Sequence, residues 1–303
     1  MQHLLSDDVL QKYRMAGRIA SEVRNSARQL VKPGVPIIEI CEGVERLIKE
    51  KGGNWAFPCN VCINDVAAHY TSPPLDVKVV PSDAMVKVDL GVQVDGYIAD
   101  TATTVCLDKR YESMYNTAQK ALQATIAALE PGVKNSRIGA VIQRTIESQG
   151  FKPIANLSGH QLAPYIIHSG KSIPNVEQFG GGSKVEEGEV FAIEPFVTLN
   201  DAAGEVRNGK DSYIFRFMRD RKPRGIEAKV MLQKIWASFR TLPFSERWLY
   251  SGSSKGLRNA FMELLASKSI MSYPVLIEAS GALVAQAEHT VLVKKDGCEV
   301  FTL

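Results

Sequence analysis

Four carboxylates and one imidazole in otherwise apolar or small-residue segments could carry chemistry in this 303-residue chain: Asp89, Asp100, His160, Glu194 and Glu288. Carboxylates in apolar runs need partners, because burying an unpaired charge is costly. Four carboxylates and a histidine suit two divalent cations, and two cations with a bridging water or hydroxide form a hydrolytic centre. Singly, each residue is more often structural than catalytic. Together they predict a metal-dependent hydrolase.

The two aspartates lie in a predicted β-hairpin. Two β-rich runs flank Asp95-Gly96, which is a strong signal for a two-residue turn. This turn would pair Asp89 with Ala102 and place Asp100 on the same face, roughly 7–8 Å from Asp89. That separation suits carboxylates that reach one metal or two adjacent metals. On the hairpin alone, two solvated surface aspartates are an equally good interpretation.

The other three residues favour the metal site. Glu194 lies in an apolar run that follows three glycines, and Glu288 lies in a second apolar run. His160 follows Ser158-Gly159, where glycine lets the backbone approach closely. The sequence therefore predicts that three further ligands join the two aspartates.

The elements that must position these residues form a repeated pattern. Apolar residues at helical spacing predict a helix over 6–30, which ends before a Pro-Gly pair, and a second helix over 36–51, which ends at Gly52. The same two helices and two breakers recur over 112–129 and 136–149, at an offset of 98 residues. The constant offset predicts two related halves, with chance alignment of a common turn dipeptide as the alternative. Segments 85–105, 189–199 and 283–293 are predicted to be β-structure.

Residues 210–270 differ from the rest of the chain in charge. They hold 13 Lys/Arg and 5 Asp/Glu, a net charge of +8 against +3 for the whole chain. Helical runs at 226–239 and 256–267 predict an inserted helical subdomain, so that 1–209 and 271–303 would form the catalytic domain. A solvated surface is the favoured interpretation of the charge. Docking to an acidic partner such as ribosomal RNA is the alternative.

Composition narrows the functional class. Hydrophobic residues make up 45% and charged residues 23%, as in ordinary globular proteins. No segment suggests a membrane helix or a secretory signal, and five cysteines suit a reduced setting, so we expect a cytoplasmic protein without a membrane segment. Cys59 and Cys62 form C-x-x-C without a second pair. They are expected to be small buried or loop residues, with a redox role as the minor alternative.

Six motifs resemble those of type II methionine aminopeptidases, the archaeal and eukaryotic form with the pita-bread fold. They are Ala67-Ala-His-Tyr-Thr71, Val88-Asp-Leu-Gly91 with Gly96-Tyr-Ile-Ala-Asp100, Asn156-Leu-Ser-Gly-His160, Ile167-His-Ser-Gly-Lys171, Ala192-Ile-Glu-Pro-Phe196 and Gln286-Ala-Glu-His-Thr290. The resemblance covers nearly the whole chain, including the helical insertion, and the short N-terminus is similar to the archaeal form. It implies an α+β pita-bread fold with pseudo-two-fold halves.

The resemblance also implies an activity. The chain would be a metal-dependent aminopeptidase that removes the initiator methionine from nascent proteins and peptides when the second residue is small. Independently of the resemblance, a monomer is the default expectation. Two divalent cations (Co, Mn, Fe or Zn) would activate a bridging water or hydroxide. Asp89 would chelate one cation, His160 and Glu194 would hold the other, and Asp100 and Glu288 would bridge both.

Other side chains receive roles from the same resemblance. His69 would take part in proton transfer or steady the tetrahedral intermediate, and His168 would contact the scissile carbonyl; structural histidines are the alternative. Four residues would line the methionine pocket, with ordinary core packing as the alternative: Phe57, Ile167, Phe196 and Tyr273. His3 and His289 are expected to be structural. Pro164, after the ligand His160, departs from many relatives and puts the local loop shape in question.

Two further functions remain open on the sequence. A related pita-bread enzyme that cuts before or after proline would use a similar ligand set, but usually carries an added N-terminal domain that we do not find. A metal-free pita-bread protein could act as a nucleic-acid or protein binding module. Lost ligands would favour that hypothesis and none is lost, so the basic insertion is its only support.

Overall fold

The fold is described from a computed structural model, which covers residues 5–178, 180–250 and 254–303. Two helical pairs agree closely with the predicted ranges. The first is α1 (Asp7–Leu30) and α2 (Ile37–Glu50), and the second is α3 (Glu112–Ala128) and α4 (Asn135–Ser148). Gly34 and Gly132, just after the first helix of each pair, share positive φ angles of 79° and 89°. The repeated backbone conformation supports the prediction of two related halves.

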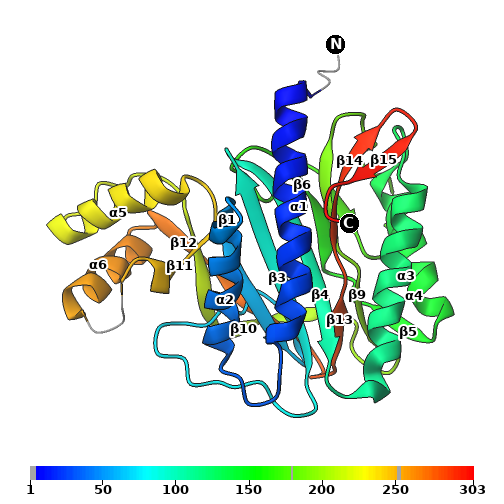
Figure 1. The fold of residues 1–303 in the computed structure, drawn as a ribbon, viewed down its shortest axis with the longest axis horizontal. Helices are drawn as coiled ribbons and strands as arrows, with labels where there is room; N and C mark the ends of the chain where they lie inside the picture. Colours follow the sequence, from blue (N-terminus) through cyan, green and yellow to red (C-terminus); the bar gives the residue numbers. More distant parts are fainter. Residues whose placement is uncertain (1–4, 179, 251–253) are drawn as a thin grey trace.

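Helix α1 shows why these segments are helical. Ser6 caps its N-terminus by accepting a hydrogen bond from the Val9 amide, and Asp7 and Asp8 lie in the first turn, where the helix dipole favours negative charge. Its buried face carries apolar residues at helical spacing, including Ile19 and Val23. In Figure 1, α1 lies across strands β3 (Met85–Val94) and β4 (Tyr97–Cys106).

The strands form four antiparallel sheets. The first joins β3 and β4 to β1 (Asn54–Ile63), and the second has the order β11 (Phe244–Ser245), β10 (Val206–Phe217), β12 (Ile270–Glu278), β2 (Val66–Ala68). The third is β13 (Val284–Gln286), β9 (Phe196–Leu199), β5 (Phe151–Pro153). The fourth is β15 (Gly297–Val300), β14 (His289–Lys294), β8 (Val190–Ile193), β6 (Ser158–Leu162), β7 (Ser172–Pro174). Mixed helix and sheet confirm the predicted fold class.

Each half has its own hydrophobic core. One core packs α1 and α2 against β1 and β3, and includes Ile40, Val44 and Val88. The other packs α3 and α4 against β8, β13 and β14, and includes Ile142 and Phe191. Two cores with matching helical pairs give the pseudo-two-fold architecture predicted from the offset.

Two of the predicted β-segments are interrupted. The run 189–199 divides into β8 and β9, and the run 283–293 divides into β13 and β14. The first break contains Glu194-Pro195, and proline cannot donate a hydrogen bond to a strand ladder. The second contains Ala287-Glu288. Both predicted glutamate ligands therefore lie where one strand ends and the next begins.

The insertion is less purely helical than predicted. Residues 210–217 belong to β10, which pairs with β12, and the helical part consists of α5 (Ile226–Phe239), the 3₁₀ turn Glu246–Trp248 and α6 (Lys255–Ala266). A second 3₁₀ turn, Lys109–Tyr111, precedes α3. Figure 1 shows α5 and α6 at the opposite end of the molecule from α3 and α4.

A buried ion pair joins the insertion to the catalytic halves. Glu45 of α2 accepts hydrogen bonds from both terminal nitrogens of Arg247 at 2.9 and 2.5 Å, and from the Trp248 indole at 2.9 Å. Both charged side chains are about 95% buried, so losing either partner would leave an uncompensated charge. This contact fixes the insertion, and with it one edge of β10, against the rest of the protein.

Two remaining sequence expectations concern cysteines and membrane segments. Cys59 and Cys62 are buried in β1 and carry free thiols. None of the helices in the described ranges is long and apolar enough to cross a membrane.

Candidate metal centre

The hairpin forms with the predicted register. Asp95 and Gly96 both adopt positive φ angles, 51° and 90°, as a two-residue type I′ turn requires. Asp89 pairs with Ala102, and Asp100 therefore lies on the same face as Asp89, one diagonal step along the ladder. The turn alone thus fixes the relative positions of two candidate ligands.

The other three candidates come from adjacent strands of the C-terminal half. His160 of β6 pairs with Ala192 of β8, and β8 in turn pairs with β14, where His289 lies opposite Ile193. The breaks that carry Glu194 and Glu288 therefore lie side by side. This pairing brings Glu194 and Glu288, which are 94 positions apart in the sequence, to the same end of the sheet.

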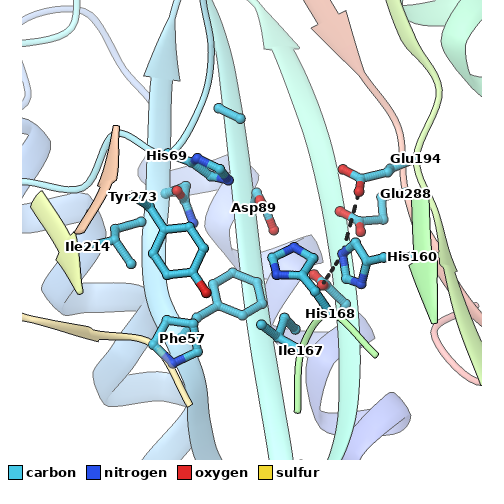
Figure 2. Close-up of a pocket in the computed structure, with 14 residues that line it drawn as sticks. Phe57, His69, Asp89, His160, Ile167, His168, Glu194, Ile214, Tyr273 and Glu288 are labelled. Atoms are coloured by element: carbon cyan, nitrogen blue, oxygen red, sulfur yellow. Dashed lines mark ion pairs between the residues drawn. The ribbon is translucent and has the colours of Figure 1, made fainter. Parts of the chain in front are cut away.

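All five side chains line one pocket, and Figure 2 labels four of them there: Asp89, His160, Glu194 and Glu288. The His160 Nε2 atom lies 3.6 Å from Asp100 Oδ2 and 3.5 Å from Glu194 Oε1. Asp100, His160 and Glu288 each offer a ligand atom, and these atoms all lie within 4.8 Å of one another. Asp89 borders the same pocket.

Burial gives this cluster unusual electrostatics. It raises the pKa of Asp89 to about 7. It also raises the pKa values of Asp100, Glu194 and Glu288 well above their ordinary range, and repulsion from neighbouring carboxylates adds to each shift. The pKa of His160 is held well below its usual value, first by burial. Four anions without cations would repel one another here, and bound metal would remove the conflict.

Unpartnered atoms test whether the residues fit divalent cations. The Oδ1 atoms of Asp89 and Asp100 are buried and have no hydrogen-bond partner among the residues that the structure describes. Buried oxygens of this kind are rare unless they serve a ligand or ion. Carboxylate oxygens and an imidazole nitrogen are suitable ligands for Mn, Fe, Co or Zn. The donor set and its unpaired oxygens fit divalent metal.

Two further histidines border the centre without joining the cluster of close ligand atoms. His168 packs edge-on against His160, with ring centroids 4.3 Å apart, and burial followed by the nearby His69 lowers its pKa to about 4. His69 has a positive φ of 66°, and its Nδ1 atom lies 3.2 Å from the carbonyl oxygen of Pro274. Burial lowers the pKa of His69 as well. Both imidazoles are therefore neutral near pH 7.

A small pocket of about 60 Å³ opens onto the cluster. Three of the four predicted pocket residues line it: Phe57, Ile167 and Tyr273. Phe196 lies in an adjoining cavity of about 320 Å³ that also contacts Glu194 and His168. Its ring packs with Ile154 and Val284 rather than against the small pocket.

The sequence did not predict several residues that position the candidate ligands or line the small pocket. Gln286 donates through Nε2 to Glu194 and Glu288, in each case at 3.3 Å, and so braces both glutamates. Ile214 and Pro243 of the insertion region complete the small pocket. A signal existed for Gln286, which stands two residues before a predicted ligand in a strand. None existed for Ile214 or Pro243, because only the tertiary fold brings them to the site. His289 contacts Arg24 and Thr302 on the far side of the sheet, and His3 lies outside the described residues.

Comparison with known proteins identifies the family. The family model described as metallopeptidase family M24 matches residues 11–295, which include every candidate ligand. The chain belongs to metallopeptidase family M24. Membership of family M24 implies the use of divalent metal, and Asp100, His160 and Glu288 form a group that could hold a metal ion.

Individual relatives agree with this family M24 assignment. A methionine aminopeptidase of Methanothermobacter thermautotrophicus is 46% identical over 298 residues, which cover 97% of this chain and 99% of that protein. Among solved structures, a thermophilic Arx1 superposes with a TM-score of 0.85 at 19% identity, covering 98% of this chain and 91% of the other. A methionine aminopeptidase from Thermotoga maritima gives 0.72 at 20% identity, covering 100% and 99%. These structural likenesses confirm the pita-bread fold.

Proposed function

We propose that this chain is a methionine aminopeptidase that removes the initiator methionine from peptides and nascent proteins whose second residue is small. The observation that carries the proposal is a small, mainly apolar pocket placed directly against the carboxylate–histidine cluster. A pocket this small, about 60 Å³, would select for a single side chain. The similarity to an archaeal methionine aminopeptidase over nearly the full chain supports the same substrate.

The pocket suits methionine in particular. Phe57, Ile167 and Tyr273 surround it with aromatic and branched apolar groups, and Ile214 and Pro243 close it. An unbranched thioether adapts to such an irregular apolar space and makes favourable contacts with aromatic rings. The substrate amino group would then lie at the carboxylates, which would fix the first peptide bond beside His168.

The ligand roles are part of the proposal. Asp89 would hold one cation and His160 with Glu194 a second, while Asp100 and Glu288 would contact both. When bound, divalent cations supply a nucleophilic water at neutral pH and polarise the carbonyl oxygen. The close approach of Asp100, His160 and Glu288 supports these assignments, as do the unpartnered aspartate oxygens.

The neutral histidines suit proton and hydrogen-bond chemistry. The Pro274 carbonyl can only accept a hydrogen bond, so the Nδ1 atom of His69 carries its proton and Nε2 keeps a free lone pair. His69 Nε2 can therefore take up and return a proton. His168, whose pKa is about 4, can donate a hydrogen bond from a neutral ring to the scissile carbonyl oxygen.

A peptide panel tests the proposal. The purified protein would be assayed with Met-Ala-Ser, Leu-Ala-Ser, Met-Trp-Ser and Ala-Pro-Ser, with each of Co, Mn, Fe and Zn added in turn. We expect cleavage of Met-Ala-Ser alone at a high rate. Equal rates on the leucine peptide would contradict methionine preference, and preferential cleavage of the proline peptide would favour the related proline-specific activity. No cleavage with any metal would favour a binding module.

We also propose that the protein acts as a monomer in the cytoplasm. A further proposal is that its insertion, residues 210–270, contacts ribosomal RNA. Five basic side chains are exposed within a short stretch before and at the start of α5: Arg219, Arg221, Lys222, Arg224 and Lys229. Residues 210–270 carry a net charge of +8, which supports attraction to an acidic surface. Such contacts weaken steeply with salt, because each one releases counterions.

Co-sedimentation with ribosomes tests this contact. Wild type and a variant with Arg221, Lys222 and Arg224 replaced by glutamine would be compared at low and high salt. Binding that falls with salt and is reduced in the variant would support the proposal. A variant in which the exposed Arg46 and Lys120 are replaced should bind like wild type, and equal losses in both variants would contradict a role for the insertion.

A further inference from the structure

A second cavity lies on the opposite face of the sheet from the metal centre. It has a volume of about 620 Å³ and is bounded by α1, α3 and the last residues of the chain. Successive side chains of a strand point to opposite faces. Thr103 and His289 border this groove, whereas Asp100 borders the metal centre, and Glu288 borders both cavities. Figure 1 shows the C-terminal segment running between α1 and α3.

Two arginines of α1 project into this groove. Arg24 donates through Nη1 to the hydroxyl of Thr101 and to the carbonyl oxygen of Thr302, each at 2.8 Å, and approaches the His289 ring at 3.1 Å. Arg28 donates through Nη1 to the Thr103 hydroxyl at 2.5 Å. All these partners are neutral oxygens or an imidazole, so neither guanidinium has its charge compensated by them.

Carboxylates do not compensate the two charges either. Over residues 5–178, 180–250 and 254–303, no carboxylate oxygen lies within 4.0 Å of either guanidinium. Glu112, Glu288 and the C-terminal Leu303 border the groove but make no such ion pair with Arg24 or Arg28. Burial, and to a smaller extent Arg28, lower the pKa of Arg24. Two adjacent guanidiniums that share no anion leave positive potential in a concave site, which favours an anionic ligand.

The rest of the lining is suited to hydrogen bonding. Four amide side chains face the groove: Asn25, Asn116, Gln119 and Gln123. The Nε and Nη2 atoms of Arg28 make no hydrogen bond within the described part of the chain, so one planar edge of this guanidinium is free for bidentate contact. The groove volume falls within the range of roughly 300–1,000 Å³ usual for small-molecule sites.

We propose that this groove binds a small molecule bearing a phosphate or diphosphate group. The anion would lie between Arg24 and Arg28 and take the free edge of Arg28, and the amide side chains would bind the neutral part of the ligand. A guanidinium fork matches the oxygens of a phosphate in two parallel hydrogen bonds. The groove shares Glu288 with the pocket of the peptidase centre, but Arg24 and Arg28 border the groove alone, so the proposed anion site does not depend on which peptide the enzyme cleaves.

The two arginines differ in how well they test the proposal. Arg24 holds Thr101 and His289, each of which directly follows a candidate metal ligand in the sequence, so its loss would disturb the metal centre as well. Arg28 contacts Thr103 and Tyr115, further from the ligands, and its side chain is exposed. Arg28 is therefore the better residue to replace.

Calorimetric titration with inorganic phosphate provides the test. The metal-loaded enzyme would be titrated at constant ionic strength, with sodium chloride as the reference salt. We expect one phosphate per chain, and Arg28→Met should weaken binding about tenfold or more, since a charge-assisted hydrogen bond is worth at least that factor. Arg28→Lys should bind with intermediate affinity, because lysine keeps the charge but lacks the fork. Arg46→Met, at an exposed arginine of α2, is the matched control and should bind like wild type.

Several outcomes would overturn the proposal. Phosphate binding that survives Arg28→Met but disappears when metal is removed would place the anion at the peptidase centre. An equal loss in Arg28→Met and Arg46→Met would indicate a general charge effect. Succinate binding as tightly as phosphate would refute the phosphate class, and no binding of phosphate would refute the site. A thermal melt of each variant identifies any loss that comes from misfolding.

Discussion

The two halves of this protein share a helical pair and a core, yet they supply metal ligands in different ways. The N-terminal half places Asp89 and Asp100 on a continuous hairpin, where a two-residue turn fixes their register. The C-terminal half places Glu194 and Glu288 in breaks between short strands. The hairpin ligands are held by a regular backbone ladder, whereas the glutamates rely on side-chain support from Gln286.

This difference has an energetic consequence. In the hairpin, ladder hydrogen bonds satisfy the backbone around each aspartate, and the Asp100 amide has a further acceptor in the Thr290 hydroxyl at 2.7 Å. At the breaks the ladder stops, so the positions of the glutamates depend on contacts between strands distant in sequence. We expect the hairpin ligands to stay in place without metal and the glutamates to depend more on their neighbours.

Replacing Asp100, the hairpin residue proposed to contact both cations, should have the largest effect on metal binding and activity. Asp100→Asn removes a negative charge but keeps the shape of the side chain. Replacing a residue that only orients a metal ligand typically lowers metal affinity or activity about 10–100-fold. Replacing a ligand itself should therefore lower them more than about 100-fold. Metal stoichiometry and peptidase rate would be measured together, with the exposed Asp201→Asn as control. Full metal content with near-normal activity would remove Asp100 from the centre.

Glu194→Ala should have the next largest effect, because this residue is proposed to hold only one cation. We expect metal content to fall towards half and activity to fall with it, while the fold survives. A structural carboxylate would behave differently, since its loss would lower the melting temperature and spare metal binding. Metal stoichiometry beside a thermal melt separates the two interpretations.

His69→Ala separates proton transfer from metal binding. A positioned proton-transfer group contributes on the order of 10²–10⁴-fold, so kcat should fall by about 100-fold or more while metal content stays at the wild-type level. Lys120→Ala, at an exposed residue of α3, is a comparison that should leave both kcat and metal content at the wild-type level. If His69→Ala strips metal, the division between ligands and other histidines is wrong.

Gln286→Leu tests the hydrogen bonds that position the two glutamates of the C-terminal half. Leucine fills a similar volume but cannot donate to Glu194 or Glu288, so metal affinity should fall about 10–100-fold, as for other groups that orient ligands. Metal titration of the variant would measure the change. Asn60→Leu is the comparison, because Asn60 lies beside Asp89 on the hairpin side of the pocket. If Asn60→Leu lowers metal affinity as much as Gln286→Leu does, the ligands of both halves depend equally on neighbouring side chains.

The smallest expected effect is a pH dependence of stability in the metal-free protein. Burial raises the pKa of Asp89 from 3.8 to about 7, so between these pH values the native state binds a proton that the unfolded chain has released. The contribution to stability is fully present below about pH 4 and is lost as the pH rises through about 7. The melting temperature of the metal-free form should fall by a few degrees over this range. Asp89→Asn should flatten the slope, and an unchanged slope would contradict the assignment.

The hairpin and the C-terminal half also differ in how far the sequence predicts them. Asp95-Gly96 is a local signal, and it was enough to predict that Asp89 pairs with Ala102. The helical pairs were equally local, because the apolar spacing lies within each segment and the glycines that follow lie next to it. The strand breaks at Glu194 and Glu288 were not predicted, because an apolar run that crosses from one sheet to another looks like one strand. Ile214 reaches the pocket only through the pairing of β10 and β12, which no local pattern encodes.

The position of Glu288 late in the sequence has a consequence for synthesis of the enzyme itself. The Thr101 hydroxyl donates to the Glu288 carbonyl across a separation of 187 residues, so the hairpin must wait for a distant segment before the centre is complete. Chains emerge from the ribosome at about 5–20 residues per second, with N-terminal parts first. The hairpin could thus be folded for many seconds while the enzyme has only part of its donor set. A partly made chain would accordingly lack a complete metal centre, and aminopeptidase activity would have to wait until the segment that carries Glu288 has joined the hairpin.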